Sequence, residues 1–197
     1  MTTRTALVEA TAELLWERGY TGTSPAMIQK RAGVGQGSMY HHFSGKVNLA
    51  VAAMHHSAGT LRETVEEALS TGQSAVERIR AYLETERDPL AGCRVGRLVQ
   101  DPEVVVDDTL RAPSGEFFAW LTERIAQVLE EGVARGELRQ DTDSRTTASL
   151  LVAAVQGGYV LARARRDPQV FRHCVAGALR AVEALRAAPA PSRSPED

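Results

Sequence analysis

The chain has 197 residues, of which 43% are hydrophobic and 24% charged, and its formal net charge is −2. That length suits one domain, or two small ones, with a real apolar core. The apolar runs are far shorter than a membrane span and no charged-then-apolar leader opens the sequence, so we expect a cytoplasmic protein that does not enter membranes. Cys93 and Cys174 lack any metal or redox spacing, which favours two buried, reduced thiols over a redox sensor.

The first predicted element is an amphipathic helix over residues 3–18, with Leu7, Ala10, Leu14 and Leu15 on its inner face. A second, short helix is predicted to begin at Ser24-Pro25. The serine hydroxyl can cap unpaired backbone N–H groups, and the proline ring already has the φ of a first helical turn. Gly33 is expected to end this helix, because the chain turns there through a positive φ.

A third short helix is predicted from Gln36 to Phe43, after a turn of three to four residues. Met39 and Phe43 are expected to face inwards, which leaves the polar side chains of this helix in solvent. Two short helices joined by such a turn fit the major groove of DNA. Gln36 lies where side chains reach base edges, and glutamine can bond adenine bidentately. Gly37 keeps the backbone close to DNA, and hydroxyl or cationic groups suited to phosphate oxygens are found at Ser24, Ser38, Tyr40 and Lys46.

The charge is unevenly distributed along the chain. Residues 1–50 contain five Lys or Arg and three acids, a balance of +2, whereas the rest contains 18 basic and 22 acidic residues, a balance of −4. The three early acids all lie in the first predicted helix, so residues 18–50 contain neither Asp nor Glu. A basic patch free of acids is expected opposite phosphates, and its small size predicts a moderate salt dependence of binding.

The rest of the chain predicts further helices and no strand, so the expected fold class is all-α. A long helix over residues 46–69 would join the N-terminal unit to the C-terminal part of the chain. Pro102 and Pro113 bracket a stretch without a clear helical pattern. The other expected helices cover 74–86, 117–135, 146–165 and 168–186, and the Pro-, Ala- and Ser-rich residues 188–197 are expected to be a disordered tail.

The last two predicted helices are each apolar on two faces. One stripe is rich in small residues, including Gly157 and Gly158 on the first helix and Gly177 and Ala178 on the second. A helix that is apolar on two faces must bury both. We therefore expect one face to pack inside the chain and the other against a second copy, as a four-helix bundle across a two-fold axis. A monomer with both faces internal is the alternative.

A ligand pocket is expected among the central helices, lined mainly by apolar and aromatic groups. Its candidate residues are Tyr82, Cys93, Phe117, Phe118, Trp120, Leu121, Val155 and Tyr159, each of which could equally be ordinary core. Arg94 and Arg97 are candidates to hold an anionic ligand or, alternatively, to pair with acids such as Glu86 or Asp101.

The run from Thr23 to Lys46, with Ala32-Gly33-Val34 and Gly37-Ser38-Met39-Tyr40-His41-His42-Phe43, resembles the DNA-binding domain of TetR-family transcriptional regulators. The resemblance covers roughly residues 4–52. It implies an all-α homodimer with an N-terminal three-helix helix-turn-helix DNA-binding domain (1–48) and a C-terminal helical ligand-binding and dimerisation domain (49–187). It also implies that Gln36 and His41 read bases, that Tyr40 and Lys46 contact phosphates, and that His42 lies at a phosphate or the groove edge.

The function implied is sequence-specific regulation of transcription from an operator with paired half-sites. Repression is the family default, with release by a small, largely apolar effector. Our hypothesis for release is that the effector moves the lower end of the 46–69 helix, meaning the end nearest the DNA-binding domain. This movement changes the separation of the two copies of the 36–43 helix in the dimer. The alternative is a dimeric small-molecule-binding or protein-interaction module without DNA function.

An enzyme is not expected, because the sequence lacks a Ser-His-acid set, a paired-carboxylate signature and a metal motif. No cofactor is predicted. His41 and His42, with His55 and His56, could be metal ligands. However, adjacent histidines on a helix point about 100° apart, and no Cys, His or Asp spacing completes a tetrahedral set.

Overall fold

The computed structural model describes residues 2–188. In chain order the helices are α1 (Thr3–Arg18), α2 (Pro25–Ala32), α3 (Gln36–His42), α4 (Lys46–Ser70), α5 (Ala75–Glu84), the 3₁₀ turn η1 (Leu98–Gln100), α6 (Pro102–Val106), α7 (Asp108–Ala134), α8 (Ser144–Arg165) and α9 (Pro168–Glu183). Within the described residues no strand forms, apart from an isolated antiparallel bridge between Leu138 and Arg186. The predicted all-α fold class is confirmed.

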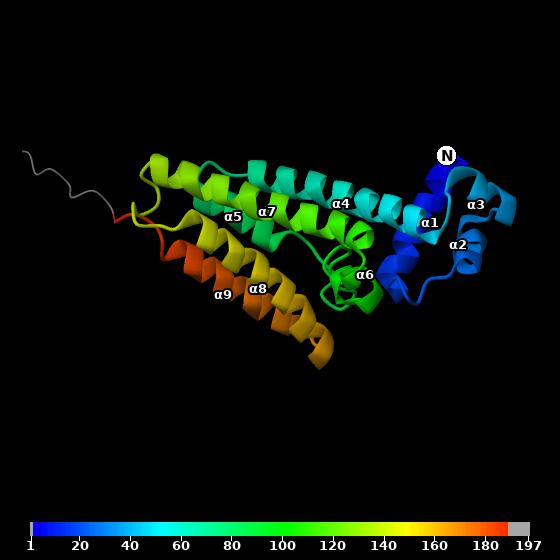
Figure 1. Cartoon of the computed structure of the whole chain (residues 1–197). Helices are drawn as coiled ribbons and strands as arrows, with labels where there is room; N and C mark the ends of the chain where they lie inside the picture. Colours follow the sequence, from blue (N-terminus) through cyan, green and yellow to red (C-terminus); the bar gives the residue numbers. More distant parts are fainter. Residues whose placement is uncertain (1, 189–197) are drawn as a thin grey trace, which may run out of the picture.

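The molecule is elongated, with α1, α2 and α3 grouped at one end and α5, α8 and α9 toward the other (Figure 1). The long helix α4 begins beside the first group and runs alongside α7. One apolar core joins α1–α3 to the first half of α4 and also takes in Leu98, Val104 and Leu110. A second core lies among the second half of α4, α5, α7, α8 and α9. Leu98, Val104 and Leu110 therefore anchor the segment 98–110 to the core that supports the N-terminal helices.

The predictions for the N-terminal helices are confirmed. The first helix covers residues 3–18, and Leu7, Leu14 and Leu15 on its inner face are at most 2% exposed. Pro25 occupies the first turn of α2, and the Ser24 hydroxyl accepts a hydrogen bond from the Met27 N–H at 3.3 Å. The sequence pattern thus located both the start and the inner face of these helices.

The helix predicted over 117–135 begins nine residues earlier, at Asp108, and contains Pro113. Proline did not break it, for two reasons. Asp107 caps the helix by accepting hydrogen bonds from the N–H groups of Thr109 and Leu110 at 2.8 and 3.1 Å. Pro113 lies in the second turn, so its ring removes only one hydrogen bond near the start of a 27-residue helix. Pro113 is itself buried, so its ring contributes to packing.

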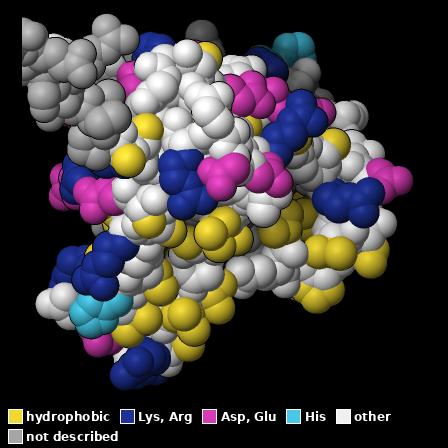
Figure 2. Space-filling model, turned by 90° about the vertical axis from the view of Figure 1, so that its left-hand side faces the viewer, with side chains coloured by type: hydrophobic (Ala, Val, Ile, Leu, Met, Phe, Trp, Pro, Cys, Tyr) yellow, Lys and Arg dark blue, Asp and Glu magenta, His cyan; other side chains and the backbone are white. Residues whose placement is uncertain are grey.

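The two faces of α8 and α9 have different surroundings within the single chain. Leu151 and Val155 of α8 and Phe171 of α9 are buried in the second core. Leu150 and Leu161, from the small-residue stripe of α8, are 56% and 49% exposed. Seen from the end of the molecule far from α1–α3, apolar side chains gather low on the surface, at the height of α8 and α9 (Figure 2). One chain alone therefore leaves an apolar face of these helices uncovered.

The chain end is only partly described. Ala187 donates its N–H to the Glu137 carbonyl at 2.9 Å, next to the Leu138–Arg186 bridge. The predicted disordered tail, 188–197, lies outside the described residues apart from Ala188.

Candidate nucleic-acid interface and effector cavity

The turn between α2 and α3 has the geometry of a helix-turn-helix. Gly33 caps α2 in the left-handed region with φ of 67°, and Val34 donates its N–H back to the Gln29 carbonyl at 3.1 Å. Thr23, 2% exposed, donates its hydroxyl to the Gly19 carbonyl at 2.7 Å and so supports the preceding turn. These local contacts set α3 at a fixed angle to α2.

The inner face of α3 is well anchored. Met39 is fully buried and Phe43, just after the helix, is 7% exposed, and both belong to the N-terminal core together with Ile28 of α2. An amide N–H of Gln29 also approaches the Met39 sulfur at 3.6 Å. Because α3 has only seven residues, this burial, rather than helix propensity, is what holds it in place.

The outer face of α3 is polar and open to solvent. Tyr40 is 49% exposed. The other candidates on this surface, Ser24, Gln36, Gly37, Ser38, His41 and His42, are exposed, whereas Lys46 at the start of α4 is intermediate. Most of the predicted DNA-binding side chains thus lie on α3 or just after it, whereas Ser24 lies at the start of α2.

The positive charge of this end is smaller than a residue count indicates. Arg31 makes a bidentate pair with Glu17, at 2.8 and 2.9 Å, so much of its charge is neutralised. Lys46 places its Nζ 3.8 Å from the centre of the Tyr20 ring, and Arg4 lies over the Phe43 ring at 5.2 Å. These contacts bring both cations close to α3 and its C-terminal end.

The two histidines of α3 lie against each other in an edge-to-face arrangement, with ring centroids 5.0 Å apart. Among residues 2–188, no three His, Cys, Asp or Glu side chains come together in a group that could hold a metal ion. His41 and His42 are therefore left as exposed hydrogen-bonding groups on the outer face of α3.

Four of the eight predicted effector residues are buried in the second core, and the other four are partly buried against it. Tyr82, Phe117, Leu121 and Val155 are at most 3% exposed, and burial raises the pKa of Tyr82 to about 12. Phe118 borders a shallow hollow on α7, and Trp120 packs near Phe117 with Arg62 over its ring. Cys93 and Tyr159 are the two that line a distinct cavity.

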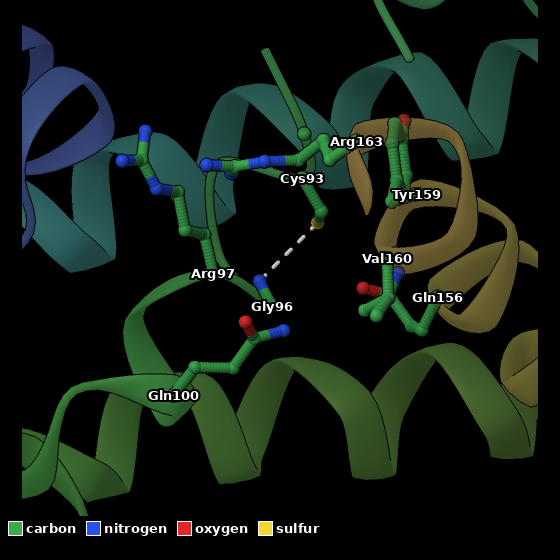
Figure 3. A pocket seen from close by; sticks show the side chains of 9 residues that line it. Cys93, Gly96, Arg97, Gln100, Gln156, Tyr159, Val160 and Arg163 are labelled. Atoms are coloured by element: carbon green, nitrogen blue, oxygen red, sulfur yellow. Dashed lines mark hydrogen bonds between the residues drawn. The ribbon is translucent and has the colours of Figure 1, made fainter. Parts of the chain in front are cut away.

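This cavity, of about 210 Å³, lies between the segment 92–100 and one face of α8 (Figure 3). Its lining combines the Cys93 thiol, guanidinium groups, amides and an aromatic ring, from Gly92, Cys93, Gly96, Arg97, Gln100, Gln156, Tyr159, Val160 and Arg163. The Gly96 N–H points to the Cys93 sulfur at 3.3 Å. A Cβ at Gly96 would approach the Gln156 amide oxygen to 2.1 Å, so a larger residue there would require the Gln156 side chain to move. Burial raises the pKa of Tyr159, whose phenol therefore stays protonated.

Sequence reasoning missed six of the residues that line this cavity: Gly92, Gly96, Gln100, Gln156, Val160 and Arg163. A signal existed for α8, since Gln156, Tyr159, Val160 and Arg163 follow the i, i+3, i+4, i+7 spacing of one helix face. No local pattern indicated that this face would meet residues 92–100, which lie more than fifty positions earlier in the chain.

The segment that lines the cavity also contacts α1 directly. The Trp16 indole N–H donates to the Gly92 carbonyl at 2.9 Å, and the Arg97 guanidinium donates to the Trp16 carbonyl. Arg94 pairs with Glu13 at 2.8 Å and lies over the Trp16 ring at 3.8 Å. Neither arginine pairs with Glu86 or Asp101, the acids considered from the sequence; both hold α1 instead.

The fold and the exposed face of α3 define a helix-turn-helix DNA-binding protein joined to a helical domain with its own core. Comparison with known families agrees. Residues 7–53 match the model described as "Bacterial regulatory proteins, tetR family", and residues 73–178 match "Tetracyclin repressor-like, C-terminal domain". The chain belongs to the TetR family. It is a DNA-binding transcriptional regulator and not an enzyme.

Individual relatives extend over nearly the whole chain. The transcriptional regulator AcuR of Cereibacter sphaeroides is 29% identical over 170 residues, covering 83% of this chain and 77% of AcuR. A TetR-type regulator from Chloroflexus aurantiacus superposes with a TM-score of 0.86 at 28% identity, covering 94% of this chain and 97% of that one. CifR bound to a 26-base-pair operator DNA shares the fold, with a TM-score of 0.76, 23% identity and coverage of 90% and 95%. Regulators of this family bind DNA as homodimers and respond to small-molecule effectors.

None of the helices within residues 2–188 has the length and apolar character that crossing a membrane requires.

Proposed function

We propose that residues 1–48 form the DNA-binding unit and that α3 enters the major groove. The observation that carries this proposal is the contrast across α3: Met39 is fully buried while Tyr40 beside it is 49% exposed. Gln36 and His41 then read base edges, and His42 lies at a phosphate or at the groove edge. The phosphate contacts come from Ser24, Ser38, Tyr40 and Lys46, with Gly37 allowing close approach of the backbone.

Residues 49–187 form the dimerisation and effector-binding unit. The exposed apolar stripe of α8, with Leu150 and Leu161, and the neighbouring face of α9 pack against the same stripe of a second copy. Gly157 supports this assignment, because a Cβ there would meet no atom of its own chain within 4 Å. A two-fold dimer presents two copies of α3, which suits an operator with paired half-sites.

The protein acts as a repressor that a small effector releases from its operator. The cavity between residues 92–100 and α8 is the proposed effector site, since its lining segment holds α1 through Trp16. Release then proceeds through this segment as well as through the lower end of α4, because both elements support α1. We place this activity in the cytoplasm, where bacterial DNA is found.

The test is a fluorescence-anisotropy titration of the full-length protein against DNA from upstream of its own gene. Scrambled DNA of the same length and composition serves as the specificity control. We expect tight, saturable binding to the upstream DNA and much weaker binding to the scrambled duplex. Equal affinity for the two duplexes, or no binding to either, would contradict the proposed function.

Lys46→Met separates phosphate contact from base reading. This change removes the charge and keeps an apolar stem against the Tyr20 ring. Affinity is expected to fall similarly for all duplexes, with the slope of log K against log salt reduced by about one for each protomer. Arg111→Met on α7, which removes an exposed arginine paired only with Asp108, is the matched control and should leave both quantities unchanged.

A further inference from the structure

The cavity between residues 92–100 and α8 carries an unbalanced positive charge. The guanidinium groups of Arg97 and Arg163 extend toward each other beside it (Figure 3). Among residues 2–188 neither group is in an ion pair; Arg97 donates to the Trp16 carbonyl, and Arg163 approaches the Ala91 carbonyl at 3.4 Å. Two cations thus face one cavity without an acid inside it.

The nearest acids lie outside the cavity. Asp101 and Glu103 line a neighbouring hollow that shares Arg97 and Arg163 as a wall. Asp101 is already engaged there, because its two carboxylate oxygens accept hydrogen bonds from Thr21. Partial burial lowers the pKa of Arg97, and the like charge of Arg163 lowers it further. Both effects disfavour the charged form of Arg97 when it has no partner, and a bound anion would stabilise that charged form.

The rest of the lining limits the size and shape of a ligand. Gln100 and Gln156 contribute amides that can donate hydrogen bonds, whereas Tyr159 and Val160 contribute apolar surface. The cavity has a volume of about 210 Å³, which suits a small ligand better than a long acyl chain. The ligand is therefore small, with an anionic end and a short apolar body.

We propose that this cavity binds a small carboxylate, with Arg97 and Arg163 as its charge partners and Tyr159 and Val160 against its apolar part. Guanidinium groups hold a carboxylate through paired hydrogen bonds, and the apolar surface of Tyr159 and Val160 favours an organic anion over inorganic phosphate. The inference rests on the proposed effector-responsive function and narrows the chemical class of the effector.

The position of Arg97 connects ligand capture to the DNA-binding unit. Its guanidinium now donates to the Trp16 carbonyl of α1, and a carboxylate in the cavity competes for the same donor groups. Arg163 lies against the backbone of residues 91–92, where a Cβ on Gly92 would be 3.0 Å from its Nη1. Binding between the two arginines therefore draws the 92–100 segment toward α8 and loosens its hold on α1.

The experiment is isothermal titration calorimetry of the full-length protein, without DNA, using sodium propionate, butyrate and benzoate as probes. Propionamide is the neutral control of matched shape, and inorganic phosphate is the tetrahedral anion. At least one carboxylate is expected to bind, and propionamide is not. Absence of binding by all three carboxylates, or tighter binding of phosphate than of any of them, would overturn the proposal.

Variants locate the site. Arg163→Met and Arg97→Met are each expected to weaken carboxylate binding at least tenfold, and Arg163→Lys, which keeps the charge but loses the planar fork, less so. Arg111→Met should bind as the unchanged protein does. Thermal unfolding of Arg163→Met checks that the fold is retained; Arg163 is exposed, so little change is expected. Unchanged binding by a folded Arg163→Met protein would overturn the proposed site.

Adding the same carboxylate to the protein–operator complex separates this proposal from the proposed function. If the carboxylate reduces operator affinity and this effect depends on Arg163, the result supports both the carboxylate site and effector-controlled release. Binding that depends on Arg163 without any effect on operator affinity supports the carboxylate site and contradicts effector-controlled release.

Discussion

Asp101 holds Thr21 through both of its carboxylate oxygens. One oxygen accepts the Thr21 backbone N–H at 2.9 Å and the other the Thr21 hydroxyl at 2.8 Å. Thr21 lies in the turn between α1 and α2, whereas Asp101 caps α6 by accepting the Glu103 N–H. One side chain thus ties the start of the helix-turn-helix to the segment that lines the proposed effector cavity, and eighty positions of sequence separate the two residues.

Asp101→Ala is expected to destabilise the protein by about 1–2 kcal/mol, because it removes three hydrogen bonds to a charged acceptor at a partly exposed site. That corresponds to a fall in Tm of roughly 2–8 °C for a chain of this size. Asp108→Ala is the control, since Asp108 is highly exposed and pairs only with Arg111. Equal melting temperatures for the two variants would show that the Asp101–Thr21 contact contributes nothing.

The contribution of Asp101 should depend on pH. Burial raises the pKa of this carboxyl, but hydrogen bonds from Thr21 and Glu103 outweigh that effect and leave the pKa below its ordinary value. A lowered folded-state pKa means stability that is present above the unfolded pKa, about 3.9, and lost as the pH falls through the folded value. Urea unfolding should show a constant difference between wild type and Asp101→Ala near neutral pH, and a narrowing one below about pH 4. A difference that persists in acid would assign the effect to packing instead.

Gln36→Ala should relax sequence preference at one base pair in each half-site. The expected loss of discrimination there is about 1–3 kcal/mol, the value of a bidentate side chain–base contact. Binding-site selection from a randomised operator library measures it. Gln73→Ala, at an exposed position beyond α4, provides a glutamine control that should select the wild-type sequence. If Gln36→Ala also selects that sequence, Gln36 is not a base reader.

Leu161→Glu should separate the dimer while leaving the subunit folded. Leu161 is 49% exposed in the single chain, so the new carboxylate is solvated in the monomer and buried without a partner in the proposed dimer. We expect the dimer dissociation constant to rise at least about 100-fold, equivalent to about 3 kcal/mol. Sedimentation equilibrium is the measurement, with Val106→Glu on α6, 82% exposed, as the control. An unchanged dissociation constant would place the dimer contact elsewhere.

Two glycines of α7 should respond to alanine with opposite signs. At Gly132 a Cβ would be 2.5 Å from the Ala75 Cβ and 3.0 Å from Leu138, so overpacking of about 1–3 kcal/mol outweighs the helix-propensity gain of about 1 kcal/mol. At Gly115 a Cβ would meet nothing within 4 Å, and the same gain should appear as added stability. Thermal unfolding compares the two variants. If the Gly132→Ala protein is more stable than wild type, the packing between α5 and α7 adjusts to the added methyl group at little cost.

The sequence by itself determined the DNA-binding end. The cap at Ser24, the turn at Gly33 and the inward spacing of Ile28, Met39 and Phe43 depend on contacts within about twenty residues. The polar face of α3 follows from that same spacing, because burying one side of so short a helix exposes the other. Pro113 shows the limit of local reasoning, since the Asp107 cap and the length of α7 outweighed a residue that usually ends a helix.

Only the tertiary structure decided the cavity proposed for the effector and its link to α1. Tyr82 and Phe117, expected to line a pocket, are instead buried in the core, because apolar side chains look alike in sequence whether they border a cavity or fill it. Arg97 and Arg163 became a pair only when α8 folded back onto residues 92–100. The hydrogen bonds from Trp16 to residue 92 and from Thr21 to Asp101 likewise join segments far apart in the sequence, and no periodic pattern indicates them. Contacts between segments far apart in sequence depend on how whole helices pack, and no local spacing encodes that.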